Sequence, residues 1–154
     1  MLYGETTTKL RPIRVIHKNA SDLGFLGCFC KRAGSSFDTF RYFKTRPLDV
    51  IENHRVTLLG FCGGNPVAYA HLDYEDEKMW LGICVIEGMT GRGYGKIMMV
   101  ELMAYARTFG VPEVHLSVNK DNIGGRRLYE KFGFELCDKK EPNTLFYRWR
   151  NAYV

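Results

Sequence analysis

The segment from residue 80 to residue 134 is the part of the chain that most constrains its fold. It contains an apolar run at 81–85, a glycine-rich loop, a long amphipathic stretch at 97–109, a second apolar run and a second amphipathic stretch. A short apolar run favours a strand, whereas apolar residues that recur every three or four positions favour a helix. The segment therefore predicts the order strand, loop, helix, strand, helix, with Gly133 ending the second helix.

The loop at 91–96 reads Gly-Arg-Gly-Tyr-Gly-Lys and opens the first of these helices. Backbone N–H groups at a helix start lack helical partners, and the helix dipole adds partial positive charge there. Such a loop is a candidate receptor for a pyrophosphate. It matches neither the dinucleotide fingerprint, which would need glycine in place of Lys96, nor a P-loop. An ordinary glycine turn before a helix is the alternative.

The rest of the chain adds strands and helices around this segment. A strand is expected at 13–17, and a helix at 19–32 with Ser21 or Asp22 as its cap. Two strands at 55–62 and 66–74 form a hairpin around Gly63-Gly64-Asn65. A short helix is expected at 47–54 and a final hairpin at 134–149. The expected fold class is α/β (α+β): residues 1–154 form a single domain with a mixed, mostly antiparallel twisted sheet of about six or seven strands and about four helices.

The composition excludes several other classes of protein. No apolar run approaches the ~18–20 residues that cross a bilayer, and residues 1–14 carry no signal peptide, so no membrane contact and a cytoplasmic location are expected. The net charge of +5 is spread along the chain and suits a polyanionic small cofactor as well as nucleic acid, so the charge alone does not decide; no nucleic-acid partner is expected. The five cysteines show no C-x-x-C spacing and the four histidines are scattered, so no metal is expected. Exposed strand edges would allow a homodimer.

The residues after the second strand narrow the choice of phosphate ligand. With Asn122, Tyr129 and Gly133-Phe134 at these spacings, the segment 80–134 resembles the Gcn5-related N-acetyltransferase (GNAT) family. The resemblance implies a GNAT-like domain with acetyl-CoA as cosubstrate. It assigns cofactor binding to the strand residues Ile83, Cys84 and Val85, to the loop residues Gly91, Arg92, Gly93, Tyr94, Gly95 and Lys96, and to Asn119 and Asn122. Thr90 stands where relatives carry glutamine or arginine, so Arg92 or Lys96 would contact the phosphates.

The same resemblance implies an acid, and the residues suggest candidate bases. Tyr129, seven residues after Asn122 and on the same helix face, would protonate the departing CoA thiolate. An attacking amine must lose a proton, but Met79 and Ser117 occupy positions where relatives carry a glutamate base. His71 is the first substitute and Asp73 the second, since Tyr69, His71 and Asp73 share one strand face. Glu87, His115 and a water relay are the alternatives.

The polar and aromatic segment at 35–44 is the expected acceptor-binding region, with Phe37, Phe40, Arg41 and Tyr42 as substrate-binding residues. It faintly resembles the corresponding segment of enzymes that acetylate amino-sugar nucleotides. The expected function is acetyl transfer from acetyl-CoA to the primary amine of a small molecule, by direct attack in a ternary complex. The alternatives are a protein or peptide N-acetyltransferase and a non-catalytic CoA-binding module.

Overall fold

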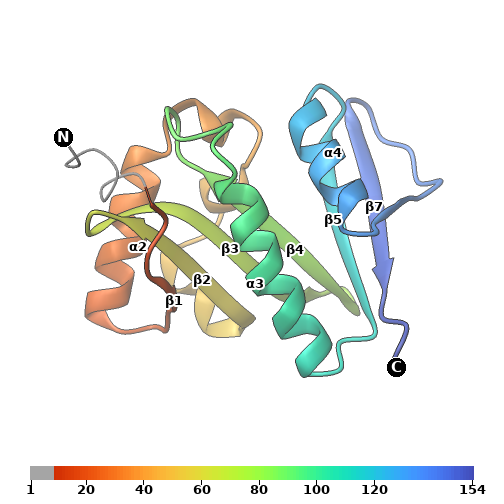
Figure 1. Cartoon of the computed structure of the whole chain (residues 1–154), viewed down its shortest axis with the longest axis horizontal. Helices are drawn as coiled ribbons and strands as arrows, with labels where there is room; N and C mark the ends of the chain where they lie inside the picture. Colours follow the sequence, from red (N-terminus) through yellow and green to blue (C-terminus); the bar gives the residue numbers. More distant parts are fainter. Residues whose placement is uncertain (1–8) are drawn as a thin grey trace.

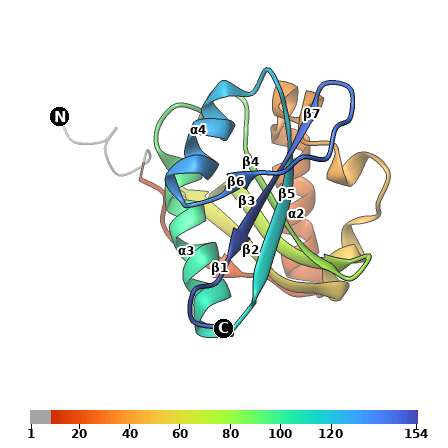
Figure 2. The same ribbon diagram turned by 90° about the vertical axis from the view of Figure 1, so that its right-hand side faces the viewer.

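The strands of this protein form one mixed sheet in the order β1-β2-β3-β4-β5-β7-β6. Figure 1 shows β2, β3, β4, β5 and β7 following one another across the view, and Figure 2 labels β6. A computed structural model describes residues 9–154. The strands are β1 (Ile13–Val15), β2 (His54–Cys62), β3 (Asn65–Glu75), β4 (Lys78–Val85), β5 (Glu113–Asn119), β6 (Glu135–Leu136) and β7 (Thr144–Arg150). The α-helices are α2 (Ala20–Arg32), α3 (Tyr94–Thr108) and α4 (Ile123–Lys131), and three 3-10 helices are η1 (Gly34–Asp38), η2 (Tyr42–Lys44) and η3 (Leu48–Asn53).

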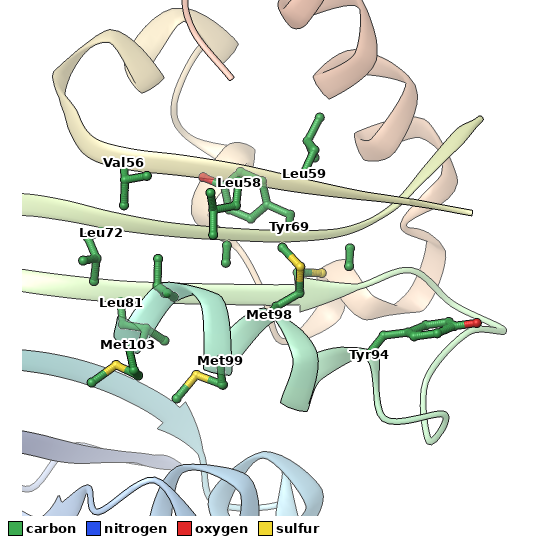
Figure 3. Close-up of a cluster of buried hydrophobic side chains, with 14 of the residues drawn as sticks. Val56, Leu58, Leu59, Tyr69, Leu72, Leu81, Tyr94, Met98, Met99 and Met103 are labelled. Carbon is green, nitrogen blue, oxygen red and sulfur yellow. The ribbon is translucent and has the colours of Figure 1, made fainter. Parts of the chain in front are cut away.

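Helices cover both faces of the sheet. Figure 2 shows α2 and α3 on opposite sides of the strands. The face of α3 that packs on the sheet consists of Met98, Met99, Leu102, Met103 and Ala106, all with 0% exposure. Figure 3 shows its methionines lying against strand residues that include Leu72 and Leu81. The helix-period apolar stripe in the sequence thus became the buried face of α3.

All neighbouring strands of the sheet are antiparallel except β4 and β5, which are parallel and separate along part of their length. β4 pairs with β3 along its whole length, from Val85 opposite Ala68 to Lys78 opposite Glu75. β4 and β5 run parallel and share a single register pair, Trp80 with His115. Beyond that pair the two strands separate, which is visible in Figure 1 as a wedge that widens toward α4. The edge of β4 at 83–85 therefore has no strand neighbour on the β5 side among residues 9–154.

The fold class expected from the sequence is confirmed, and the differences are local. The sheet has seven strands, and the hairpin turn places Gly63 and Gly64 at positive φ of 55° and 83°. The short helix expected at 47–54 is the 3-10 helix η3, and the acceptor segment contains η1 and η2. No helix within residues 9–154 combines the length and the apolar character that crossing a membrane requires.

The expected cap of α2 was wrong, because Asn19 caps this helix rather than Ser21 or Asp22. The Asn19 side-chain oxygen accepts a hydrogen bond from the Asp22 N–H at 2.8 Å. Asp22 instead accepts from the His17 N–H at 2.8 Å and pairs with Arg14 at 3.4 Å. Asp22 therefore fixes the chain that enters the helix.

Replacing Asn19 by alanine should lower the free energy of unfolding by about 1 kcal/mol, the usual value for a lost N-cap. Urea denaturation measures this change. Ser21→Ala is the control and should shift the free energy by less than about 0.5 kcal/mol, as surface substitutions do. The opposite ranking of the two variants would contradict the assigned cap.

Candidate active site

Two adjoining cavities occupy the wedge between β4 and β5. The first has a volume of about 320 Å³ and the second about 590 Å³. Their shared lining comes from the acceptor segment, from both separating strands and from α4, namely Thr39, Phe40, Arg41, Ile83, Ser117 and Tyr129. The second cavity extends over β3 to His71 and Asp73. A ligand placed in the wedge would therefore contact residues from the hairpin, the acceptor segment and α4 at once.

Tyr129 is the α4 residue that both cavities share. The residue is only 7% exposed, and its ring packs edge-on against Phe134 with centroids 6.2 Å apart. Burial raises the pKa of the Tyr129 phenol well above its usual value, and the nearby Cys84 thiol contributes in the same direction. The hydroxyl forms no hydrogen bond with any residue from 9 to 154. Tyr129 thus presents a phenol proton to the cavities at neutral pH.

The loop before α3 keeps its backbone donors available. The described residues supply no acceptor for the N–H groups of positions 91–96, and the first bonded N–H is that of Ile97, which donates to the Gly93 oxygen at 3.1 Å. Gly91 and Gly93 adopt positive φ of 74° and 84°, a backbone shape that glycine adopts without strain. A β-carbon at either position would meet nothing within 4 Å. The loop therefore has room for an anion beside unsatisfied donors.

Gly95 has a different role from its neighbours in the loop. A β-carbon at position 95 would lie 3.3 Å from the Leu128 side chain of α4. The absence of a side chain there lets α3 and α4 approach each other. No spacing in the sequence predicts this contact, because the two residues belong to different elements.

The turn that starts α4 uses both asparagines predicted for cofactor binding. The Asn119 side-chain oxygen accepts from the Asp121 N–H at 2.9 Å, and that of Asn122 accepts from the Gly125 N–H at 2.9 Å. A β-carbon at Gly125 would lie 2.7 Å from the Asn122 amide nitrogen, so this glycine accommodates the cap. Both asparagines also line the first cavity.

A chain of hydrogen bonds that the sequence did not reveal ends at Asp73. The Tyr42 hydroxyl donates to an Asp73 carboxylate oxygen at 2.8 Å and lies 2.7 Å from His54 Nε2. Because the hydroxyl has one proton, His54 Nε2 must carry the proton of the second bond. His54 Nδ1 is then the acceptor for the Thr57 hydroxyl at 2.8 Å. Every group in the chain thus directs a proton toward Asp73, which is 6% exposed and lines the second cavity.

His71 lies beside this chain in a closely packed aromatic group. Its ring centroid is 4.4 Å from that of Tyr42 and 4.6 Å from that of His54, and its Nδ1 shares a hydrogen bond with the Tyr69 hydroxyl. Burial, with a smaller contribution from His54, lowers the pKa of His71 well below its usual value. His71 therefore stays neutral at neutral pH and is a weak proton acceptor.

Gly82 makes the position of His71 possible. The two residues are directly opposite in the β3–β4 register. A β-carbon at position 82 would lie 2.6 Å from both Cε1 and Nε2 of the imidazole. The His71 imidazole thus packs directly on the backbone of Gly82, where no side chain stands in its way.

The structure places three of the four predicted acceptor residues at the cavities. Phe40 and Arg41 line both, and Tyr42 lines the second. Phe37 lines neither and packs instead against Phe29 of α2, with ring centroids 6.3 Å apart. The alternative bases also lie elsewhere: Glu87 accepts a hydrogen bond from the Ser35 hydroxyl at 2.7 Å, and His115 contacts Glu113 at 3.3 Å.

One wall of the first cavity was not predicted from the sequence. It comes from residues 142–144, which are the end of the loop before β7 and the first residue of that strand. Nothing in its sequence beyond a turn signal distinguishes this loop, and its place follows from the pairing of β5 with β7. Within the part of the chain that the structure describes, no three histidine, cysteine or acidic side chains lie close enough together to hold a metal ion.

A parallel pair of strands that separates beside a donor-rich helix start suits an extended ligand that carries a diphosphate, the class of ligand to which CoA belongs. Comparison with known sequences agrees with this class. The profile of the acetyltransferase (GNAT) family matches residues 27–134, and the chain belongs to this family. The spermine/spermidine N(1)-acetyltransferase of Bacillus subtilis (strain 168) is 32% identical over 73 residues, which are 46% of this chain and 48% of that protein.

Solved structures share the fold across most of the chain. The GNAT domain of S. lividans PAT has a TM-score of 0.75 at 16% identity, with 90% of this chain and 89% of that chain covered. The PaiA N-acetyltransferase of Thermoplasma acidophilum, solved in complex with coenzyme A, has a TM-score of 0.69 at 16% identity, with 90% and 99% covered. At these identities the likeness shows the fold.

Proposed function

We propose that this protein is an acetyl-CoA-dependent N-acetyltransferase that modifies the primary amine of a small molecule, and that residues 1–154 form one catalytic domain. The observation that carries the proposal is the wedge between β4 and β5, with Tyr129 in its lining and the donor-rich loop at 91–96 on the strand–helix connection that follows β4. Family membership supports the same reaction. A homodimer stays a prediction, to be checked by analytical ultracentrifugation.

The residues fit acetyl-CoA in two places. The N–H groups from Gly91 to Lys96, which have no acceptor among residues 9–154, suit a pyrophosphate. The edge of β4 at 83–85, which no described strand pairs with on the β5 side, suits an extended amide-containing arm added as a further strand. When bound, the cosubstrate supplies an activated acetyl group. Asn119 and Asn122 line the cavity beside this edge.

The reaction needs one proton acceptor and one proton donor. The amine nitrogen forms a bond to the acetyl carbon while the carbon–sulfur bond breaks, one proton leaves the nitrogen and one reaches the sulfur. We assign the acceptor role to Asp73, because Tyr42 orients its carboxylate and because burial leaves His71 a poor base. Tyr129 donates the proton to sulfur, since its phenol is protonated at neutral pH and lines both cavities.

Two measurements test the proposal. Isothermal titration should detect CoA binding, and free-thiol detection should show slow thiol release from acetyl-CoA alone and faster release with an accepted amine. No binding of CoA or acetyl-CoA at millimolar concentration would overturn the proposal. CoA binding with no turnover on any small amine or peptide would instead favour a non-catalytic CoA-binding module. A protein acetyltransferase would show turnover only with peptides.

Arg92→Ala should weaken CoA binding by about tenfold, if this side chain supplies the cation that Thr90 lacks. Charge-assisted hydrogen bonds contribute about 1.5–3 kcal/mol, and exposure of Arg92 to solvent places the effect at the low end. Titration calorimetry measures the change. Arg107→Ala, at the other end of α3, removes the same charge and should leave the affinity unchanged. Equal affinities in the two variants would remove Arg92 from the phosphate site.

A further inference from the structure

The basic side chains around the second cavity are more numerous than the acidic ones. Its lining includes Arg41, Lys44 and Arg46 on the basic side and Asp73 and Glu75 on the acidic side. His71 adds no charge at neutral pH. A cavity built for a polyamine, which is itself cationic, would be expected to carry the opposite excess.

One basic and one acidic side chain of the cavity neutralise each other. Arg46 pairs with Glu75 at 3.4 Å, donates to the Tyr42 carbonyl oxygen at 3.3 Å and lies over the Tyr42 ring at 4.2 Å. These contacts fix Arg46 in place as part of the wall. It is therefore not the free cation of the cavity.

Arg41 and Lys44 have no carboxylate partner among residues 9–154. Arg41 donates through Nε to the Asp38 carbonyl oxygen at 3.0 Å, which orients the guanidinium and leaves its terminal nitrogens available. Both residues are exposed at the cavity lining. Asp73 is the remaining charged residue of the cavity outside the Arg46–Glu75 pair. It is buried and accepts a hydrogen bond from the Tyr42 hydroxyl. The cavity thus presents two free cations and one oriented carboxylate.

We propose that the acceptor is an amine that also carries an anionic group, a phosphate or a carboxylate, which Arg41 and Lys44 bind while Asp73 receives the amine. This inference rests on the proposed function and names its substrate class. The aromatic walls formed by Phe40, Tyr42 and Trp80 suit a ring between the two ends of such a molecule. The polyamine acceptor in the name of the Bacillus relative lacks the anionic group.

Matched pairs of amines test the inference. The pairs are ethanolamine with O-phosphoethanolamine, glucosamine with glucosamine 6-phosphate, glucosamine with UDP-glucosamine, and putrescine with 4-aminobutanoate. The anionic member of at least one pair should have a kcat/KM at least tenfold higher than its partner, and the pair that shows the preference identifies the anion as phosphate, sugar nucleotide or carboxylate. Its KM should rise with added salt, because exposed charges are screened.

Two double variants test whether Arg41 and Lys44 in the second cavity cause the preference for amines that carry an anionic group. Arg41→Gln combined with Lys44→Gln should raise the KM for the anionic member about tenfold or more, leave the KM for the partner without the anionic group unchanged and leave the Kd for CoA unchanged. The control, Arg55→Gln with Arg107→Gln, removes two exposed charges outside the cavity and should preserve the preference. Arg55 lies over the Tyr105 ring, and Arg107 over the Trp149 ring.

The outcomes separate this inference from the function on which it rests. Turnover that is fastest with putrescine or spermidine, or equal within every pair, would overturn the anionic acceptor and leave the acetyltransferase assignment intact. An increase in the Kd for CoA in the double variant would place Arg41 and Lys44 at the cosubstrate, which also overturns the inference. Failure to bind CoA would remove the proposed function itself.

Discussion

Tyr129→Phe should lower kcat by about 100-fold and leave the KM for acetyl-CoA nearly unchanged. General acid catalysis contributes about 10²–10⁴-fold. The low end applies here because a thiol has a pKa near ~8.5, so a thiolate departs with less help than an alkoxide would need. The phenol can serve as the acid because its hydroxyl is protonated at neutral pH, as a free phenol with a pKa of ~10 also is, and because it lines both cavities. Steady-state kinetics with a saturating amine measure the change.

The structure separates this catalytic effect from a folding effect. The Tyr129 hydroxyl has no hydrogen-bond partner among residues 9–154, while its ring packs against Phe134. Phenylalanine keeps the ring, so the free energy of unfolding should change by less than about 0.5 kcal/mol. Tyr105→Phe on α3 is the matched control, since it also loses one hydroxyl but lies outside both cavities. A kcat for Tyr129→Phe equal to that of the control would exclude Tyr129 as the acid.

Acidification should destabilise the protein through two buried histidines. Burial lowers the pKa of His54 to about 4, with Arg46 lowering it further and Asp73 opposing, and the pKa of His71 falls well below its usual value. In the unfolded chain both rings bind a proton near pH ~6.5. Below that pH the unfolded state holds more protons than the folded state. The free energy of unfolding should therefore fall by about 1.4 kcal/mol per pH unit for each histidine as the pH drops below 6.5.

Urea denaturation between pH 7 and pH 4 measures this loss, and NMR of the imidazole carbons shows which rings titrate. For His54 the decline should continue toward its folded pKa of about 4 and reach about 3 kcal/mol in total. His54→Gln places a polar amide near Tyr42. It should reduce the change in the free energy of unfolding with pH by the contribution of one histidine. The buried neutral state would be contradicted if His54→Gln kept the wild-type dependence of stability on pH, or if the imidazole signals of His54 or His71 titrated near pH 6.5 in the folded protein.

The sequence predicted the fold well because its strongest signals are local. Helix-period apolar residues marked α3, and Gly63-Gly64 marked the turn between β2 and β3. The loop at 91–96 and the turn at Asn122 were recognised because spacing within one segment determines them. The wrong cap of α2 has a local cause as well: Asn19, Ser21 and Asp22 are all good capping residues, and the backbone decides among them.

The candidate site was harder to predict because its contacts join distant segments. Asp73 was chosen from its strand face, but its partner Tyr42 lies 31 positions earlier in the sequence. No spacing rule connects Tyr42 with His54, which a 3-10 helix and the start of β2 bring together. Phe37 and Phe40 are identical in type and three positions apart, yet only Phe40 reaches the cavities. Tertiary packing, which composition does not encode, decides between them.

Because Gly82 and His71 are in contact, the residue types at these two positions on neighbouring strands cannot vary independently. With histidine at position 71, any residue other than glycine at 82 would have to displace the imidazole. Loss of the histidine would free position 82 for a larger residue, and the shape of the second cavity, which both residues line, would change. A library that randomises position 82 alone should return glycine, whereas randomising both positions together should recover new compatible pairs and, with them, altered acceptor preference.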